Sequence, residues 1–148
     1  NPFIEAAISV IRELISVEAT RGELSLKASI FPCPDVTVVL GLVGQNVKGQ
    51  VIYGMSLETA KWLASRMMAG VPIEEMDEIA RSAIGELGNM VTGKASSILE
   101  KTGVNLDISP PTLVIGREVE VAPTRARVLC VGLELEDEHK IEINVGLE

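Results

Sequence analysis

Residues 82–93 read SAIGELGNMVTG, and the rest of the fold can be worked out from this segment. At about 100° per residue in a helix, Ser82, Glu86, Asn89 and Gly93 fall on one narrow stripe. The apolar residues around the segment fall on the opposite side: Met76, Ala80, Ala83, Ile84, Leu87, Val91 and Ile98. The segment therefore predicts a long amphipathic helix with one face against a core and the other face open to a partner.

Three glycines, Gly85, Gly88 and Gly93, are predicted to lie on the open face of this helix. Each glycine costs about 1 kcal/mol relative to alanine in a helix interior, so helix stability does not explain their presence. Small residues around a carboxylate and a carboxamide would let the backbone of another protein, or a bound ion, come close. We therefore expect this face to receive a partner at short range.

The long helix is predicted to open at Pro72, because acidic residues follow where the helix dipole favours them. It should run to about Lys101, since Gly103 is a typical C-terminal stop. A shorter helix is predicted after Ser56, which is a good N-cap, and it should end at Gly70.

The remaining elements follow from apolar spacing and turn residues. Another helix is predicted over residues 3–17, and strands are predicted over residues 24–28, 36–43, 47–53, 104–109, 112–115, 125–135 and 139–145. The last four strands are expected to form a meander that ends in a hairpin around the acidic turn 136–138. This order of elements indicates an α+β fold, with helices packed on a mostly antiparallel sheet, in a single domain over residues 1–148.

The first helix contains a partial copy of the spacing in the long helix. Ser9 and Glu13 repeat the Ser-x3-Glu pattern of Ser82 and Glu86, but Ser16 stands where Asn89 would be. Either the chain is built from two duplicated helix-plus-strands units, or two common residues match by chance.

Composition excludes several classes of function. A net charge of −8 repels phosphate backbones, and only 3% aromatic residues provide few stacking surfaces, so nucleic acid is not an expected partner. Cys33, Cys130 and His139 cannot assemble a zinc site, and the cysteines are expected to be buried thiols. No apolar run approaches the roughly 20 residues of a membrane span and no signal peptide is visible, so we expect a cytoplasmic protein without a metal site.

The spacing Ser82-x3-Glu86-x2-Asn89, followed by Pro110-Pro111, is the remaining candidate for chemistry. A carboxylate one turn from a carboxamide can bind a cation on a partner and orient a water molecule. A carboxamide is too weak a base to deprotonate water, but phosphoryl transfer depends more on positioning than on proton removal. On spacing alone, a solvated helix face without chemistry is the alternative.

This pattern resembles the CheC/CheX/FliY family of bacterial chemotaxis phosphatases. The family signature is Asp or Ser, three residues, Glu, two residues, Asn, about twenty-two intervening residues, and a proline. Ser82, Glu86 and Asn89 match it residue for residue, and Pro111 falls one residue short. The opening NPFIE, the length and the element order are similar to the CheX type, which carries one complete motif.

The resemblance implies an enzyme that hydrolyses the aspartyl-phosphate of a CheY-type response regulator. The long helix would enter the regulator's active site, where Glu86 would pair with a regulator lysine and Asn89 would orient the attacking water. The protein would need no cofactor of its own, because the regulator would supply magnesium. The expected partner contacts besides the catalytic pair are Ser82, Gly85, Gly93 and Pro111.

Two further expectations accompany this one. The alternative function is a non-catalytic docking module of the same fold in the flagellar switch or a signalling complex. A homodimer is also expected, through pairing of sheet edges, because the apolar run 36–43 would be an aggregation hazard at a free edge.

Overall fold

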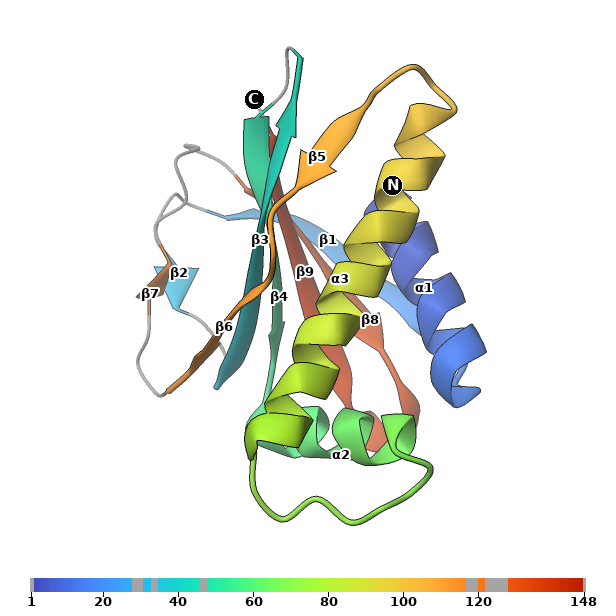
Figure 1. Ribbon diagram of the computed structural model, residues 1–148, viewed down its shortest axis with the longest axis vertical. Helices are drawn as coiled ribbons and strands as arrows, with labels where there is room; N and C mark the ends of the chain where they lie inside the picture. The colour runs from blue at the N-terminus through green and yellow to red at the C-terminus, as the bar shows by residue number, and fades with distance from the viewer. Residues whose placement is uncertain are drawn as a thin grey trace.

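Helices and strands follow one another in the predicted order (Figure 1). The computed structural model describes residues 2–27, 31–32, 35–45, 48–116, 120–121 and 128–147. Its helices are α1 (Pro2–Ile15), α2 (Leu57–Met67) and α3 (Glu78–Glu100), with a short 3-10 turn η1 (Glu136–Glu138). Its strands are β1 (Thr20–Lys27), β2 (Phe31–Pro32), β3 (Val36–Gly44), β4 (Lys48–Met55), β5 (Leu106–Ile108), β6 (Thr112–Ile115), β7 (Glu120–Val121), β8 (Val128–Glu134) and β9 (Lys140–Leu147).

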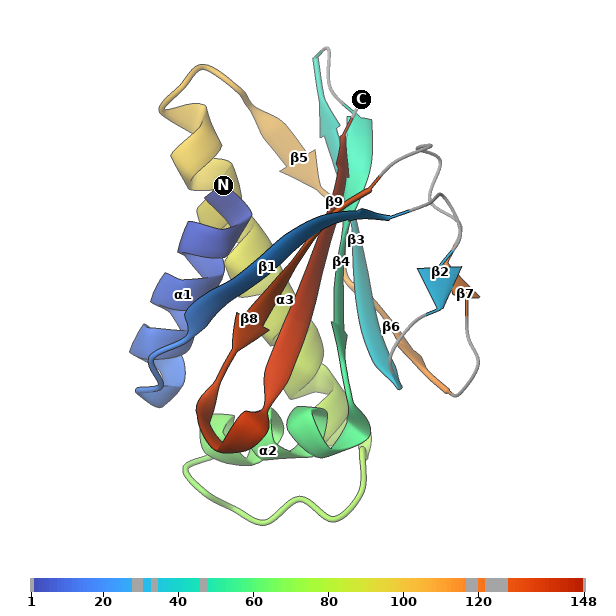
Figure 2. The same cartoon turned by 180° about the vertical axis from the view of Figure 1, so that it is seen from behind.

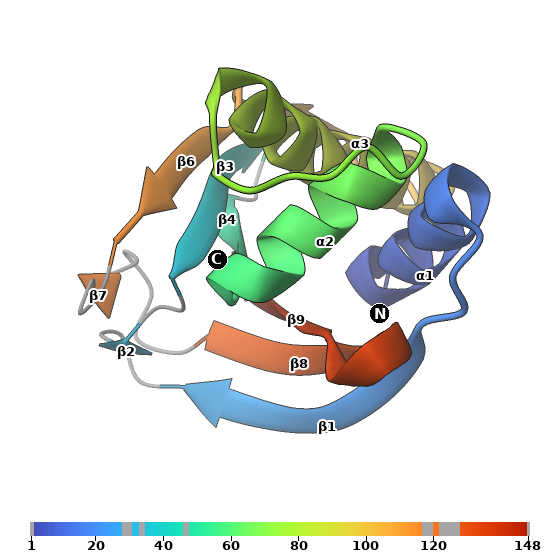
Figure 3. The ribbon, with the colours of Figure 1, turned by 90° about the horizontal axis from the view of Figure 1, so that it is seen from below.

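A curved antiparallel sheet holds the three helices on one face, as the view from below shows (Figure 3). Its strand order is β1-β8-β9-β4-β3-β5, and β6 pairs with β3 next to β5. Seen from behind, β1 crosses the molecule along one edge (Figure 2). The predicted α+β fold is confirmed, while β2 and β7, which pair with each other on the side of the sheet away from α3, were not predicted.

The strand order has an internal symmetry. Exchanging the unit α1-β1-β3-β4 with the unit α3-β5-β8-β9 reproduces the same order read from the other edge. In both units the helix lies on the same face of the sheet, and α1 contacts α3 side by side (Figure 1). This arrangement favours two duplicated units over a chance match of Ser9 and Glu13 with Ser82 and Glu86.

Strand β3 lies inside the sheet, so the expectation of a free edge there is wrong. It pairs with β4 along one side, and with β5 and β6 along the other. The alternate residues Val36, Val38, Leu40 and Leu42 are fully buried in the core below the helices. A nearly continuous apolar run is typical of a strand with neighbours on both sides, and that is the position this run takes.

The expected four-strand meander is also wrong, although the β8–β9 hairpin is confirmed. Strands β5 and β6 both pair with β3, and β8 pairs with β1. Pro110 and Pro111 separate β5 from β6 because proline has no N–H to donate to a ladder. At this interruption the Ser109 hydroxyl accepts a hydrogen bond from the Gly41 N–H at 2.7 Å.

Helix α3 begins at Glu78. The start at Pro72, which was predicted from the acidic residues that follow it, is wrong. Asp77 is the N-cap, and its carboxylate accepts a hydrogen bond from the Ala80 N–H at 2.8 Å. A side chain that satisfies a free amide at the third helical position defines a helix start more strongly than acidic residues placed near it. Most of the apolar stripe is confirmed, since Ala80, Ile84, Leu87 and Val91 are buried. Ala83 and Ile98 are partly buried, and Met76 lies before the helix begins.

The two shorter helices end close to their predicted positions. Ser56 caps α2 by accepting from the Thr59 N–H at 3.1 Å, and Gly70 follows the helix with a φ of +89°. Helix α1 ends at Ile15, two residues earlier than predicted, and Ser16 leaves it with a φ of 57°. No helix in the described ranges is long and apolar enough to cross a bilayer.

Candidate functional site

The predicted open face of α3 is exposed. Ser82, Glu86 and Asn89 are all exposed, while Ile84 and Leu87 between them are buried against the sheet. The helix is therefore rotated as the spacing predicted, with a hydroxyl, a carboxylate and a carboxamide along one side.

A groove runs between this face of α3 and the start of β6. It is lined by Glu78, Arg81, Ser82, Gly85, Glu86, Pro111 and Leu113. Gly85 forms part of its floor, and a methyl group added there would lie 3.7 Å from Cγ of Pro111. The fold thus brings Pro111 beside Ser82 and Glu86, although about twenty-five residues of chain separate them.

The prediction that Gly88 lies on the open face is wrong. A methyl group on Gly88 would lie 3.0 Å from Cγ1 of Val38 and 3.5 Å from Cδ2 of Tyr53, both in the core. This glycine lets α3 approach the chain's own sheet. Gly93 is different, because no atom of the described residues lies within 4 Å of an added methyl group. Close packing within this part of the chain therefore does not explain the glycine.

A buried hydrogen-bonded pair holds the middle of α3 on β4. The Thr92 hydroxyl is hydrogen-bonded to the Gly88 carbonyl at 2.8 Å, and the Tyr53 and Thr92 hydroxyl oxygens share a hydrogen bond, also at 2.8 Å. Burial raises the pKa of Tyr53, and the hydrogen bond to Thr92 only partly opposes this effect. Sequence reasoning missed this pair, because nothing local links two residues 39 positions apart.

The side chains of Glu86 and Asn89 form no hydrogen bond or ion pair with any other residue that the structure describes. The corresponding carboxylate in α1 is engaged within the chain. Glu13 accepts from the Ser9 hydroxyl at 3.3 Å and forms an ion pair with Lys94 of α3, also at 3.3 Å.

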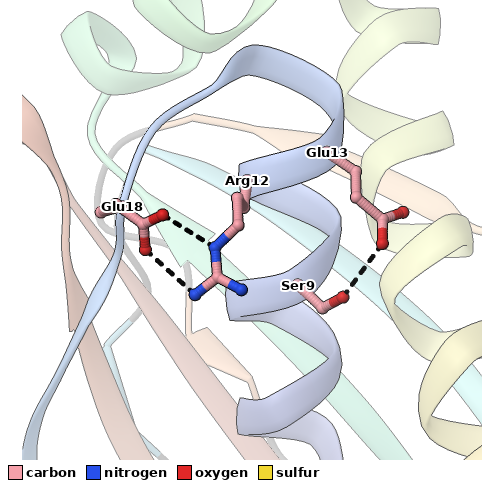
Figure 4. A network of polar contacts seen from close by, with 4 residues as sticks. All are labelled: Ser9, Arg12, Glu13 and Glu18. Carbon is pink, nitrogen blue, oxygen red and sulfur yellow. Dashed lines mark hydrogen bonds and ion pairs between the residues drawn. The ribbon is translucent and has the colours of Figure 1, made fainter.

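Figure 4 shows the surroundings of the α1 copy, in which Arg12 also binds Glu18 through a 2.8 Å contact. Ser16, the residue in place of the carboxamide, lies outside the helix. The α1 copy therefore lacks the free carboxylate and the third helical polar group that α3 presents.

His139 and Cys130 take no part in the α3 face. The His139 ring stacks on Trp62 with centroids 4.5 Å apart, and its Nδ1 is 2.8 Å from the Thr59 hydroxyl, so its contacts are with α2. Cys130 is buried, as expected, whereas Cys33 lies outside the described residues. Within those residues, no three His, Cys, Asp or Glu side chains group in a way that could hold a metal ion.

Comparison with known proteins agrees with the fold and shows the family. Residues 36–134 match the family model described as "Chemotaxis phosphatase CheX". Over 121 residues the chain is 39% identical to the CheY-P phosphatase CheX of Thermotoga maritima, covering 82% of this chain and 77% of that protein. The chain therefore belongs to the CheX family of chemotaxis phosphatases.

Solved structures give the same result at the level of the fold. The chemotaxis protein CheX from Vibrio vulnificus superposes with a TM-score of 0.90 at 23% identity, over 100% of this chain and 97% of that one. The crystal structure of the CheX-CheY-BeF3-Mg2+ complex from Borrelia burgdorferi is similar at 29% identity, with a TM-score of 0.85, over 99% of this chain and 96% of that one.

Proposed function

We propose that this protein hydrolyses the aspartyl-phosphate of a CheY-type response regulator by inserting α3 into the regulator's active site. The observation that carries the proposal is the pair Glu86 and Asn89, which are exposed on one face of α3 and without partners among the described residues. Family membership supplies the reaction class, since the relative from Thermotoga maritima is a CheY-P phosphatase.

Asn89 would orient the attacking water. A carboxamide carries both an acceptor oxygen and two N–H donors, so it can hold a water molecule in one direction. The water oxygen forms a new bond to phosphorus, the bond from phosphorus to the aspartate oxygen breaks, and inorganic phosphate leaves with the regulator carboxylate restored. Because the transition state is loose, this positioning provides the catalysis and no strong base on α3 is required.

Glu86 would form a charge-assisted hydrogen bond to a regulator lysine, which docks the helix at the phosphoryl group. Ser82, Gly85, Gly93 and Pro111 would line the contact around it. Gly93 supports this assignment, because no described residue occupies the space within 4 Å of a methyl group added there. Magnesium would arrive with the regulator, which fits the presence of Mg2+ in the CheX-CheY complex from Borrelia burgdorferi.

The geometry also supports a rigid inserting element. Helix α3 is capped by Asp77, buried along Ile84, Leu87 and Val91, and fastened to β4 through Thr92. The backbone of such a helix loses little conformational freedom when it binds, so only the side chains have to be ordered. Two further predictions accompany this function: a cytoplasmic location and a homodimer. In the described chain, the sheet edges that could pair in a dimer are β1 and the β5/β6 side.

The direct experiment is phosphate release from a phosphorylated CheY-type regulator in the presence of magnesium, with and without this protein. Wild-type protein is expected to accelerate release. Glu86→Ala should raise KM and lower the rate, while its melting temperature stays near that of wild type because the side chain is exposed. Binding without acceleration would leave the non-catalytic docking module as the function.

A further inference from the structure

Two large apolar side chains are exposed on α3 beside the reactive residues. Ile79 is 65% exposed and Met90 is 36% exposed, and both belong to a short set of exposed large hydrophobic residues in the described chain. At about 100° per residue, Ile79 and Met90 point within roughly 20° and 40° of Glu86 around the helix axis. We call this pair the apolar flank.

The apolar flank lies on the side of Glu86 away from the groove. Gly85 and Pro111 lie on the groove side of Glu86. The exposed polar residues Ser82, Glu86 and Asn89 therefore have the groove on one side and the apolar flank on the other. Isoleucine is a weaker helix former than the lysine, glutamate or glutamine usual at exposed positions. Neither helix stability nor core packing explains an isoleucine that is two-thirds exposed.

Resting on the proposed function, we infer that Ile79 and Met90 are anchors for an apolar rim on the response regulator, and that they set its affinity and not the rate of hydrolysis. Met90 lies about 6 Å and Ile79 about 10 Å from Glu86 along the axis. A typical interface covers about 800 Å² per partner, which corresponds to a radius of roughly 16 Å. A regulator that brings a lysine to Glu86 therefore covers both side chains.

The two anchors differ in what they can contribute. Ile79 exposes more of its side chain than Met90, so it has more apolar surface to lose to a partner. Methionine adapts its shape to irregular surfaces, as expected of a residue at a protein interface. Neither side chain carries a group that could act on water or phosphate, so their contacts are equal in the ground state and the transition state.

The test uses Ile79→Gln, Met90→Gln and the double variant, since glutamine favours the helix at least as well as isoleucine, is similar in length to methionine, and removes the apolar surface. The matched control is Val43→Gln, because Val43 is 52% exposed at the far end of β3 and outside the stripe. Two quantities are measured: Kd for a CheY-type regulator loaded with beryllofluoride as a phosphoryl mimic, and KM with kcat for phosphate release.

We expect Kd and KM to rise about fivefold for Ile79→Gln, about threefold for Met90→Gln, and more than tenfold for the double variant. Fivefold corresponds to about 1 kcal/mol. The kcat should stay within twofold, and Val43→Gln should match wild type. Because apolar contacts are not screened by salt, the fold-change for Ile79→Gln should be equal at low and high salt, whereas the effect of Glu86→Ala should shrink at high salt.

Three results would overturn the inference. An unchanged Kd in the double variant would exclude a regulator contact, and a lower kcat at constant KM would place these residues in the chemistry. If the double variant dissociates a dimer but binds the regulator normally, the flank is an interface between copies. Wild-type protein that binds the regulator without releasing phosphate would refute the proposed function alone, because the Kd comparison still decides the role of the flank.

Discussion

At the scale of single residues, Gly88 and Gly93 have opposite roles although they lie five residues apart in one helix. Gly88→Ala is expected to destabilise the fold by roughly 1–2 kcal/mol, because its methyl group would meet the fully buried Val38 side chain at 3.0 Å. Gly93→Ala should stabilise it by up to about 1 kcal/mol, because alanine favours the helix and space is free. Urea unfolding of the two variants measures this difference.

Gly93→Ala also reports on function. If the partner backbone comes close at this position, the more stable variant should release phosphate more slowly or bind the regulator less tightly. A variant with higher stability and full activity would show that Gly93 is not a partner contact, whereas equal stability losses at both glycines would contradict the packing described here.

Tyr53 is the only tyrosine in the chain, which makes its ionisation directly observable. Burial raises its pKa in the folded protein, so the folded state holds the proton at a pH where the unfolded chain releases it. Stability from this residue is complete below the unfolded pKa of about 10 and falls above it, by at most about 1.4 kcal/mol per pH unit.

Phenolate absorbance provides the measurement. Native protein at pH 10.5 should show almost no phenolate, and the protein in urea at the same pH should show substantial ionisation. Tyr53→Phe should lose the corresponding part of the alkaline fall in stability. Phenolate that forms in the native protein near pH 10 would mean that the hydroxyl is open to water and that the contact with Thr92 is wrong.

At the scale of elements, the start of α3 depends on one side chain. Asp77→Ala is expected to reduce the free energy of unfolding by about 1 kcal/mol, because the Ala80 N–H loses its acceptor. The control is Glu75→Ala, which removes a similar charge from an exposed residue just before the helix and should change stability by less than about 0.5 kcal/mol. Equal effects would indicate a role of net charge near the helix dipole and not of capping.

The predictions from sequence succeeded where the determinant is local. The Ser56 cap, the apolar stripe of α3 around Ile84 and Leu87, and the exposure of Glu86 and Asn89 all follow from spacing within one turn or two. They failed where a contact is distant in sequence. Gly88 lies about 200° around the helix from Glu86, so the spacing itself places it on the core side and the prediction misread it. Only its close approach to Val38, fifty residues away, could not be inferred from the sequence.

Strand neighbours were the other failure, for the same physical reason. The composition of residues 36–43 indicates a strand, and its continuous apolar character indicates burial. Two of its neighbours are β5 and β6, which lie more than sixty residues later in the chain, and no local pattern predicts that they pair with it. Prolines 110 and 111 predict a break in a strand, but not that Pro111 would reach Gly85 on α3.

At the scale of the whole molecule, the homodimer remains a prediction with a changed basis. Since β3 is internal, pairing would have to use β1 or the β5/β6 side, which end the sheet in the described chain. Sedimentation at micromolar concentration is expected to show a species of twice the 15.8 kDa chain mass. A single monomeric species across this range would contradict the dimer without affecting the catalytic proposal.

The duplicated architecture leaves one of two equivalent helices with a free carboxylate. In α1, Glu13 is held by Ser9 and Lys94, whereas Glu86 in α3 has no described partner. The two helices lie side by side on one face of the sheet. Helix α1 thus packs beside α3 without presenting a free carboxylate of its own, and the molecule is expected to have one active face, on α3.

The most direct test of the central claim is phosphate release from a phosphorylated CheY-type regulator by Asn89→Ala, with the Kd for the beryllofluoride-loaded regulator measured on the same sample. If Asn89 positions the attacking water, kcat should fall by about a hundredfold or more while Kd changes less than about threefold, because the contact matters mainly in the transition state. Asn89→Asp should be no better than Ala, since it loses the N–H donor and adds negative charge beside the phosphoryl group. Asn89→Ala protein that turns over at the wild-type rate would contradict the catalytic proposal.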